Sequence, residues 1–208
     1  MVKAGIWALL GALAGGRLAF VILNWQYFRN YPIQILQVNL GGLSWPGALI
    51  GGLIALALYA RASNQPFPDL ADSLVPLLAC LSLTAWLGCW WDGCAYGVNT
   101  SSFLGVPAAD EWGQVENRYP IQLIGAVFTL GLFWSSERAV RRNNFKPGTL
   151  SCLGLLNLAL ITFGLSLLRV DPALSWQGLR LDAWAALAIA GMGLVSLFIL
   201  YGRRKKKV

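Results

Sequence analysis

The stretch Gly41-Gly-Leu-Ser-Trp-Pro-Gly-Ala-Leu-Ile-Gly-Gly52 begins as a loop and continues as the first turn of a very apolar segment. Pro46 suits a first helical turn, because the N–H that proline lacks has no intrahelical partner there. Ser44 stands where a helix cap is expected. Gly47 and Gly51 lie one turn apart, so a neighbouring helix can approach this face closely. The pattern is typical of the entry of a transmembrane helix.

Composition points to a membrane protein. Of the 208 residues, 57% are hydrophobic and only 12% are charged, whereas a soluble domain of this length needs more polar residues to cover its surface. The apolar runs are about 18–20 residues long, enough to cross a bilayer as helix, and they do not alternate as barrel strands do. We expect an all-α polytopic membrane protein, one transmembrane domain over residues 1–208 with about six spans. The expected spans are Ala4–Leu23, Gly47–Ala60, Ser73–Trp90, Pro120–Trp134, Leu150–Leu168 and Ala183–Tyr201.

Lysine and arginine are distributed unevenly between the two sides of these spans. With both termini on one side, that side carries eleven of them: Lys3, Arg61, Arg138, Arg141, Arg142, Lys146, Arg203, Arg204, Lys205, Lys206 and Lys207. The other side carries four: Arg29, Arg118, Arg169 and Arg180. Because positive residues collect on the cytoplasmic side, we expect cytoplasmic termini and a basic cytoplasmic tail at residues 203–208. The net charge of +7 thus reflects topology, and we expect no nucleic-acid partner.

Several kinds of catalytic and metal site are excluded by residue type. The chain has no histidine, which excludes an H-E-x-x-H zinc site, a Ser-His-Asp triad and a histidine general base. Of the four cysteines only Cys89 and Cys94 lie close in sequence, so we expect neither a metal nor a cofactor. Two interpretations of this pair stay open. The two thiols form a disulfide on the oxidising outer side, or helical geometry at Cys89 keeps two small buried side chains apart.

Three polar positions stand out against their apolar surroundings. Arg17 lies about 21 Å along the first span from Lys3, at about 1.5 Å per residue, and so in the outer half of the membrane. A charge there is costly, so Arg17 either faces protein or a headgroup-filled cavity, or snorkels to the outer interface. Asp92 brings a negative charge to the membrane edge. Gln122, one turn inside the fourth span, is expected to hydrogen-bond across helices or to a polar ligand.

Six motifs carry a resemblance to a known family. They are Gly15-Gly-Arg-Leu-Ala-Phe-Val21, Tyr31-Pro-Ile-Gln-Ile-Leu36, Gly41-Gly-Leu-Ser-Trp-Pro-Gly-Ala-Leu-Ile-Gly51, Gly88-Cys-Trp-Trp-Asp-Gly-Cys-Ala-Tyr-Gly97, Arg118-Tyr-Pro-Ile-Gln-Leu123 and Leu168-Arg-Val-Asp-Pro172. In their order and spacing the chain resembles the prolipoprotein diacylglyceryl transferases, membrane enzymes that move diacylglycerol from phosphatidylglycerol to a lipoprotein cysteine. The resemblance implies phospholipid binding by the retained positions, which are Arg17, Arg118, Gln122 and Arg169.

The chain departs from this family where the resemblance implies catalysis. Pro46 stands in place of the histidine of a Ser-x-His-Gly-Gly motif. The arginine, both asparagines and the glutamate of an Arg-x-Gly-Asn-x-x-Asn-Gly-Glu motif are replaced by Trp86, Cys89, Asp92 and Cys94. Thr162 and Ser166 align with an arginine and a glutamate expected in the fifth span.

These departures lead to two functional hypotheses. Transfer needs a base for the acceptor thiol and cations for the phosphoglycerol leaving group. Because the family's histidine and two of its arginines are replaced, we expect an inactive protein. It would serve as a lipid-binding accessory or structural subunit of a complex in the bacterial cytoplasmic membrane. Its other partners are membrane chains, because seven of the ten tryptophans lie on or near the outer side.

The alternative is an active phosphatidylglycerol–prolipoprotein diacylglyceryl transferase in lipoprotein biosynthesis. Its rearranged catalytic site would use Arg17, Asp92, Arg118 and Arg169. Both hypotheses give the chain a phosphatidylglycerol-like phospholipid as partner. A third interpretation is lipid binding or transport without chemistry.

Overall fold

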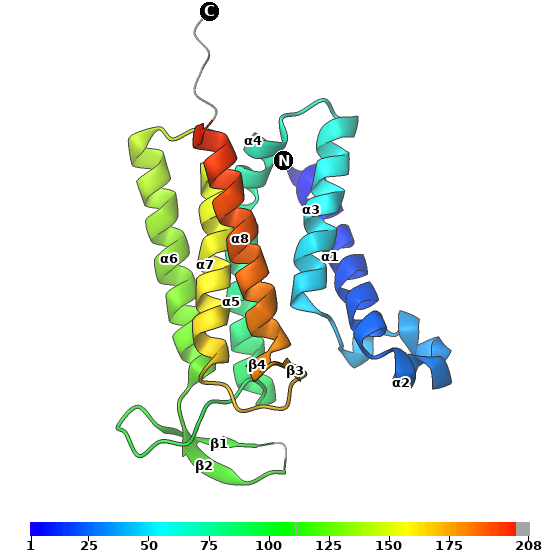
Figure 1. Ribbon diagram of the computed structural model, residues 1–208, viewed down its shortest axis with the longest axis vertical. Helices are drawn as coiled ribbons and strands as arrows, with labels where there is room; N and C mark the ends of the chain where they lie inside the picture. The colour runs from blue at the N-terminus through cyan, green and yellow to red at the C-terminus, as the bar shows by residue number, and fades with distance from the viewer. Residues whose placement is uncertain (111, 203–208) are drawn as a thin grey trace, which may run out of the picture. The chain divides into compact units, whose positions relative to one another are not determined.

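The computed structural model describes residues 1–110 and 112–202 (Figure 1). The chain forms two compact units, Met1–Leu74 and a second unit that begins at Val75. The predicted basic tail, residues 203–208, lies outside the described residues.

The first unit is built on two long helices, α1 (Val2–Leu23) and α3 (Trp45–Ala62), which lie side by side in Figure 1. The segment between them contains α2 (Trp25–Asn30) and two short 3-10 helices, η1 (Pro32–Leu36) and η2 (Val38–Leu40). A short helix, α4 (Phe67–Ser73), follows α3. Side chains from α1, α3 and α4 form a small core of Ala4, Leu56, Ala60, Leu70 and Ala71.

Glycines allow α1 and α3 to pack closely, as the sequence predicted for Gly47 and Gly51. A Cβ atom added at Gly47 would lie 2.6 Å from the carbonyl oxygen of Gly15. One added at Gly51 would lie 2.8 Å from the Cα of Gly15. Only glycine leaves room for backbones at this separation. The pairing of Gly15 with Gly47, and of Gly11 with Gly51, makes the two helices antiparallel.

The predicted start of α3 is confirmed with one correction. Pro46 lies in the first turn and Ser44 is the N-cap residue, but the Ser44 side chain makes no capping hydrogen bond. Its backbone N–H instead donates to the Gly16 carbonyl of α1 at 3.0 Å. The entry of α3 is therefore fixed by the neighbouring helix.

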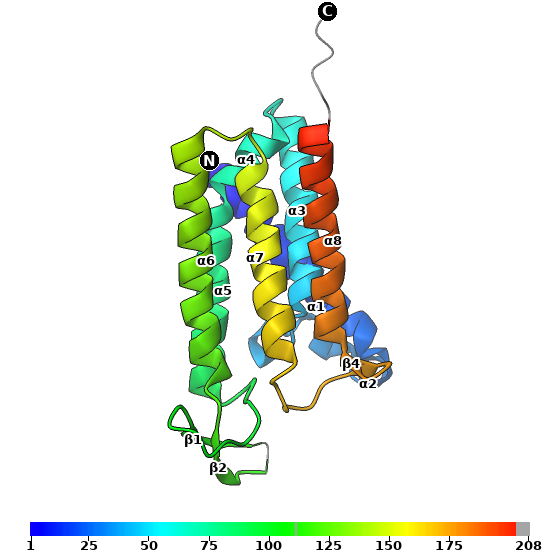
Figure 2. The same ribbon diagram turned by 60° about the vertical axis from the view of Figure 1, so that its left-hand side comes forward.

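The second unit is a bundle of four helices, α5 (Val75–Asp92), α6 (Ile121–Asn143), α7 (Thr149–Ser166) and α8 (Leu181–Gly202). Figure 2 shows α6 beside α5, with the loops between α5 and α6 and between α7 and α8 at one end of the bundle. Its core contains Val75, Ile121, Phe133, Leu150, Ile161 and Leu165. Each of these two loops carries a short hairpin. One pairs β1 (Val106–Ala109) with β2 (Val115–Arg118), and the other pairs β3 (Ser175–Trp176) with β4 (Leu179–Arg180).

The helical, polytopic membrane architecture is confirmed. Among the described residues five helices, α1, α3, α5, α7 and α8, are long and apolar enough to cross a membrane. The remaining long helix, α6, coincides with the expected span Pro120–Trp134 but continues to Asn143. Its last turns remain helical although they are charged, and Glu137 and Arg141 pair there one turn apart at 2.7 Å. The sequence prediction did not anticipate the short helices and hairpins in the loops.

Candidate functional site

Arg17 is buried on α1 and holds the segment that leads into α3. Its Nε donates to the Ile35 carbonyl at 2.9 Å, and its Nη1 donates to the Gly41 carbonyl at 2.7 Å. Further bonds reach the carbonyls of Gly42, Gln34 and Gln37. A guanidinium has five N–H donors, and five hydrogen bonds to backbone carbonyls engage them. Arg17 therefore faces protein, one of the three environments considered from the sequence, and it anchors a loop.

Three motifs that are distant in sequence meet at the loop end of the second unit. The backbone of residues 96–98 lies between the segments at residues 168–170 and 117–119. The Val98 N–H donates to the Leu168 carbonyl at 3.0 Å, and the Val170 N–H donates to the Tyr96 carbonyl at 3.1 Å. On the other side, the Tyr119 N–H donates to the Val98 carbonyl at 3.1 Å. These bonds bring the segments that carry Arg118, Gln122 and Arg169 together, whereas Arg17 belongs to the first unit.

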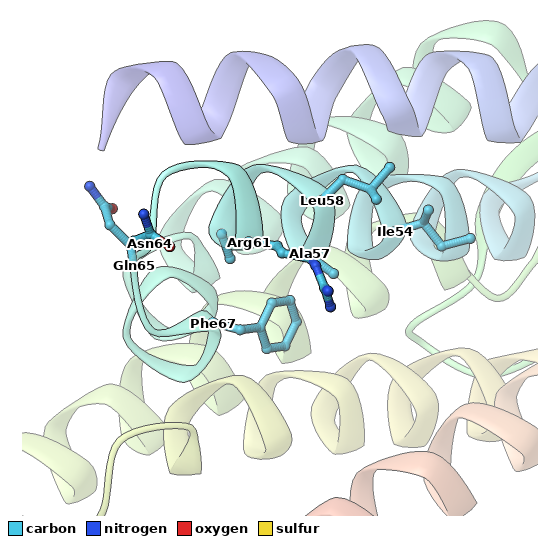
Figure 3. Close-up of a pocket in the computed structure, with 8 residues that line it drawn as sticks. Ile54, Ala57, Leu58, Arg61, Asn64, Gln65 and Phe67 are labelled. Carbon is cyan, nitrogen blue, oxygen red and sulfur yellow. The ribbon is translucent and has the colours of Figure 1, made fainter.

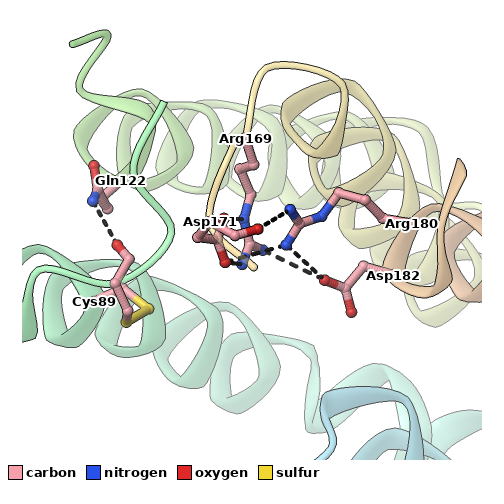
Figure 4. The surroundings of a disulfide bond; sticks show 7 residues. Cys89, Gln122, Arg169, Asp171, Arg180 and Asp182 are labelled. Atoms are coloured by element: carbon pink, nitrogen blue, oxygen red, sulfur yellow. Dashed lines mark hydrogen bonds and ion pairs between the residues drawn. A yellow bond between two sulfur atoms is a disulfide. The ribbon is translucent and has the colours of Figure 1, made fainter. Parts of the chain in front are cut away.

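Cys89 and Cys94 form a disulfide, which decides between the two interpretations left open for this pair. The helical backbone at Cys89 does not prevent it, because α5 ends at Asp92 and the chain turns back to a Cα–Cα distance of 4.7 Å. The Gln122 amide on α6 donates to the Cys94 carbonyl at 2.6 Å (Figure 4). Gln122 is buried, and its predicted cross-helix hydrogen bond goes to the loop after α5.

Arg118 is a buried cation at the base of the first hairpin. Its Nη2 lies 3.2 Å from a Glu116 oxygen and 3.4 Å from an Asp110 oxygen. Its guanidinium carbon lies 4.8 Å from the centre of the Tyr96 ring. Among the described residues, the buried Nε of Arg118 has no hydrogen-bond partner. The buried Nε of Arg180 is also without a hydrogen-bond partner among the described residues. Since an unpaired buried donor is costly, each of these two N–H groups is available to donate to an anionic ligand atom.

Arg169 belongs to an ion-pair network of two arginines and two aspartates. Its Nε and Nη2 donate to the two oxygens of Asp171 at 2.9 and 2.7 Å. Arg180 reaches the same carboxylate at 3.1 Å, and both guanidinium groups lie within 4 Å of Asp182, at 3.7 and 3.8 Å. Figure 4 shows both arginines converging on Asp171. The network joins the end of α7 to the start of α8.

Charge controls the protonation of this network. Burial raises the pKa of the Asp171 carboxyl, but hydrogen bonds and charge from Arg169 and Arg180 outweigh burial, so that the pKa lies below its ordinary value. Burial also opposes the charged form of Arg169, and the hydrogen bond and charge of Asp171 reverse this effect and raise the pKa of Arg169. Both groups are charged at neutral pH.

The remaining predicted positions carry little polar chemistry. Asp92 is exposed at the end of α5, and within the described chain its carboxylate takes part in no hydrogen bond or ion pair. Pro46 lies in the first turn of α3, where it offers no side-chain donor or acceptor. Ser166 is buried and donates its hydroxyl to the Phe163 carbonyl of its own helix at 2.7 Å.

Sequence reasoning missed the partners of the retained arginines. These are Tyr96, Asp110, Glu116, Asp171, Arg180 and Asp182. A signal was present for one pair, because Arg169-Val-Asp171 and Arg180-Leu-Asp182 repeat the same alternation of charges around a short loop. No comparable signal linked Arg118 to Tyr96, which lies in a different motif.

Comparison with known proteins identifies the family. The sequence matches the family model described as "Prolipoprotein diacylglyceryl transferase" over residues 1–199. It is 33% identical over 177 residues to the phosphatidylglycerol–prolipoprotein diacylglyceryl transferase of Parasynechococcus marenigrum, a match that covers 79% of this chain but only 63% of that protein. The enzyme of the same name from Synechococcus elongatus is 28% identical, with 96% of this chain and 72% of the relative covered. Transferase 2 of Clostridium perfringens is 27% identical, with 99% and 81% covered. The chain therefore belongs to the prolipoprotein diacylglyceryl transferase family.

Proposed function

We propose that this protein binds phosphatidylglycerol in the bacterial cytoplasmic membrane and transfers its diacylglycerol to the cysteine of a lipoprotein precursor. The observation that carries the proposal is the family match over residues 1–199, shared with relatives whose names state this reaction. The cluster around Arg118, built from three family motifs, supports it with a buried cation beside the membrane.

The proposed reaction is a substitution at carbon. The acceptor thiolate forms a bond to the glycerol carbon that carries the phosphate, and the carbon–oxygen bond breaks. The phosphoglycerol leaves as an anion, and the thiol proton passes to a base. In this proposal the unpaired Nε of Arg118 stabilises the leaving phosphate, with Arg169 adding positive charge from the adjacent segment. Asp92, exposed at the end of α5 beside the disulfide, takes the proton.

Arg17 has a different role in this proposal from the one expected from sequence. Its donors are engaged by backbone carbonyls, so a phosphate would have to displace bonds such as those to Ile35 and Gly41. We assign it the positioning of the loop before α3, and we leave phosphate contact to Arg118 and Arg169.

A second candidate function is lipid binding without transfer, as an accessory or structural subunit. The observation that favours it is the missing histidine, whose place is taken by Pro46, together with Thr162 and Ser166 in place of an arginine and a glutamate. In addition, Arg169 is paired with Asp171 at 2.7 Å, and Arg118 lies 3.2 Å from Glu116 and 3.4 Å from Asp110. A cation already paired with a carboxylate attracts a phosphate less strongly.

A lipidation assay separates the two candidates. Purified protein in vesicles of phosphatidylcholine and phosphatidylglycerol is mixed with a peptide that carries a lipoprotein cysteine, and the diacylglyceryl mass is followed on the thiol. The transferase proposal expects turnover that requires phosphatidylglycerol. Arg118→Gln should slow turnover about a hundredfold, the effect of removing one donor to a developing oxyanion. Arg29→Gln, which removes an exposed charge from α2, is the matched control.

Each outcome has a distinct meaning. Turnover that is unchanged in Arg118→Gln overturns the assignment of Arg118. Phosphatidylglycerol that co-purifies with a protein inactive in every vesicle tested supports the second candidate. In that case native extraction in mild detergent, followed by mass spectrometry, should find other membrane chains at constant ratio, and a lone monomer contradicts the subunit role.

A further inference from the structure

An open groove of about 600 Å³ lies at the C-terminal end of α3, within the first unit. It is lined by the last turns of α3, the turn that follows and the first residue of α4. The lining residues are Ile54, Ala57, Leu58, Ala60, Arg61, Asn64, Gln65 and Phe67. Most of this surface is apolar, and its polar groups all come from residues 61–65.

The groove changes from apolar to cationic along the helix axis. Ile54, Ala57 and Arg61 are spaced by three and four residues, so they share one face of α3. At about 1.5 Å per residue, Arg61 lies about 10 Å beyond Ile54 toward the helix end. The distribution of lysine and arginine puts this end of α3 at the cytoplasmic surface. Ile54 therefore lies deeper in the membrane, and Arg61 is attached to the backbone nearer headgroup depth.

Arg61 differs from the buried arginines of the outer loops. It is exposed, and its guanidinium forms no hydrogen bond or ion pair with any other residue that the structure describes. In Figure 3 its side chain runs back along α3 toward Ala57, so that its guanidinium lies over the groove near Phe67. Asn64 and Gln65 also line the groove, and their side chains lie beyond Arg61 in the turn that follows α3 (Figure 3). A guanidinium has five donors for a phosphate, and here none is engaged by a described neighbour.

We propose that this groove binds an anionic phospholipid of the cytoplasmic leaflet, with the phosphate at the Arg61 guanidinium and one acyl chain against Ile54 and Leu58. Two exposed apolar side chains support this occupant, since Ile54 is 57% and Leu58 is 64% exposed beside a cation. A phospholipid has the same order of groups, with an anion at headgroup depth and a hydrocarbon chain below it.

This site is separate from the proposed transfer site. The transfer site proposed above uses Arg118 and Arg169, which the distribution of lysine and arginine puts on the outer side of the membrane. Gly47 lies at the outer end of α3, and Arg61 lies 14 residues further along the helix, about 21 Å toward the cytoplasmic side. The groove would thus hold a lipid that is not the substrate, and the inference does not depend on transferase activity.

Photolabelling tests the proposal on the full-length protein. The probe is a phosphatidylglycerol with a photoactivatable acyl chain, at low mole fraction in phosphatidylcholine vesicles, and labelled peptides are mapped by mass spectrometry. Label is expected on the peptide that contains Ile54 and Phe67. Arg61→Gln should reduce it about fivefold, which corresponds to the roughly 1 kcal/mol of one cation near a membrane surface. Ile54→Gln, at an exposed position about two helical turns from Arg61, should weaken the acyl-chain contact while keeping the cation.

Two controls make the result decisive. Arg138→Gln removes one charge from the cytoplasmic end of α6, where Arg138 lies over Trp134, and it should leave the label near Ile54 unchanged. A photoactivatable phosphatidylcholine should label this peptide weakly. Equal loss of label in Arg61→Gln and Arg138→Gln means general attraction to the membrane and overturns the site. Equal labelling by both lipids, or cross-linking of this peptide to another protein chain, also overturns it.

Discussion

Arg17 illustrates how a single charged residue in a membrane helix can serve the backbone of a loop. The Nε of Arg17 donates a hydrogen bond to the carbonyl of Ile35, eighteen residues further along the chain. Its Nη1 donates to the carbonyls of Gly41 and Gly42. Rings of Phe20 and Phe28 lie 5.9 and 5.3 Å from its guanidinium carbon. The loop carbonyls need donors at this depth, because hydrocarbon supplies none.

We therefore expect Arg17→Gln to loosen the loop before α3. Carbonyls that lose their donor in a buried setting cost at least about 2 kcal/mol, so amides of residues 34–42 should exchange hydrogen roughly thirtyfold faster. Hydrogen exchange read by mass spectrometry measures this directly. Arg29→Gln removes an exposed charge from the neighbouring α2 and should leave exchange unchanged. Equal protection in wild type and Arg17→Gln would show that the hydrogen bonds do not hold the loop.

Asp171 makes the stability of the folded protein depend on pH, and the sign of this dependence follows from its lowered pKa. Its charged form is stabilised in the folded state, so its contribution to stability is present above the pKa of the unfolded carboxyl, about 3.9, and is lost as pH falls through the lower folded pKa. Asp171→Asn should therefore cost about 1.5–3 kcal/mol at pH 7, the range for hydrogen bonds to charged groups. Below pH 4 the difference from wild type should shrink. Thermal unfolding in detergent across pH measures it, and a difference that stays constant at all pH values contradicts this role.

Helix packing in the first unit depends on glycine at the contact between α1 and α3. Gly47→Val should destabilise this pair by about 1–3 kcal/mol, because the added side chain meets the Gly15 carbonyl at 2.6 Å. Gly131→Val on α6 is the matched control, since a Cβ there meets no atom within 4 Å. Both variants make the same change in helix propensity from glycine to valine, so the difference between their thermal midpoints isolates the packing. Equal midpoints would mean that the two helices separate without cost.

At the scale of elements, the sequence predicted the helices well and the loops poorly. Long apolar runs, and the Ser44–Pro46 sequence at the start of α3, depend only on residues that are close in sequence. Such features locate the start of a helix to within a few residues. The loops are organised by bonds between distant residues, such as Val98 with Leu168, and by the pairing of Arg180 with Asp171. Contacts of this kind produce no periodic pattern in the sequence. For the same reason the candidate arginines were predictable as positions, while their partners were not.

Cys89–Cys94 shows the same limit on a smaller scale. The spacing allowed both a disulfide and two separate thiols, and the outcome depended on where α5 ends. The helix stops at Asp92, and Gly93 and Ala95 adopt positive φ values of 70° and 56°. Gly93 reverses the chain between the two cysteines, and the Cys94 N–H donates to the Cys89 carbonyl at 2.9 Å, which brings the thiols together. A cysteine pair at a helix end is thus decided by the turn that follows.

For the molecule as a whole, α6 decides on which side each loop lies. It is not among the five helices that are long and apolar enough to cross a membrane, because its last turns contain the charged residues Glu137, Arg138, Arg141 and Arg142. Its two ends are nevertheless tied to the two ends of α7. At the start of α6, the chain pairs through residues 96–98 with Leu168, just after α7. At the end of α6, only residues 144–148 separate it from Thr149. A helix joined to both ends of a spanning neighbour must itself span.

Reporter fusions test this conclusion. With six spans, a periplasmic-active reporter inserted in the first hairpin at Gly113 should be active, and the same reporter inserted after Asn144 or at the C-terminus should be inactive. If α6 lay on the surface instead, Gly113 and Asn144 would share one side and give the same activity. The eleven-to-four division of lysine and arginine gives the direction, because the charged end of α6 then lies in the cytoplasm with the loop before α7. An active fusion at Asn144 would reverse the topology of the whole second unit.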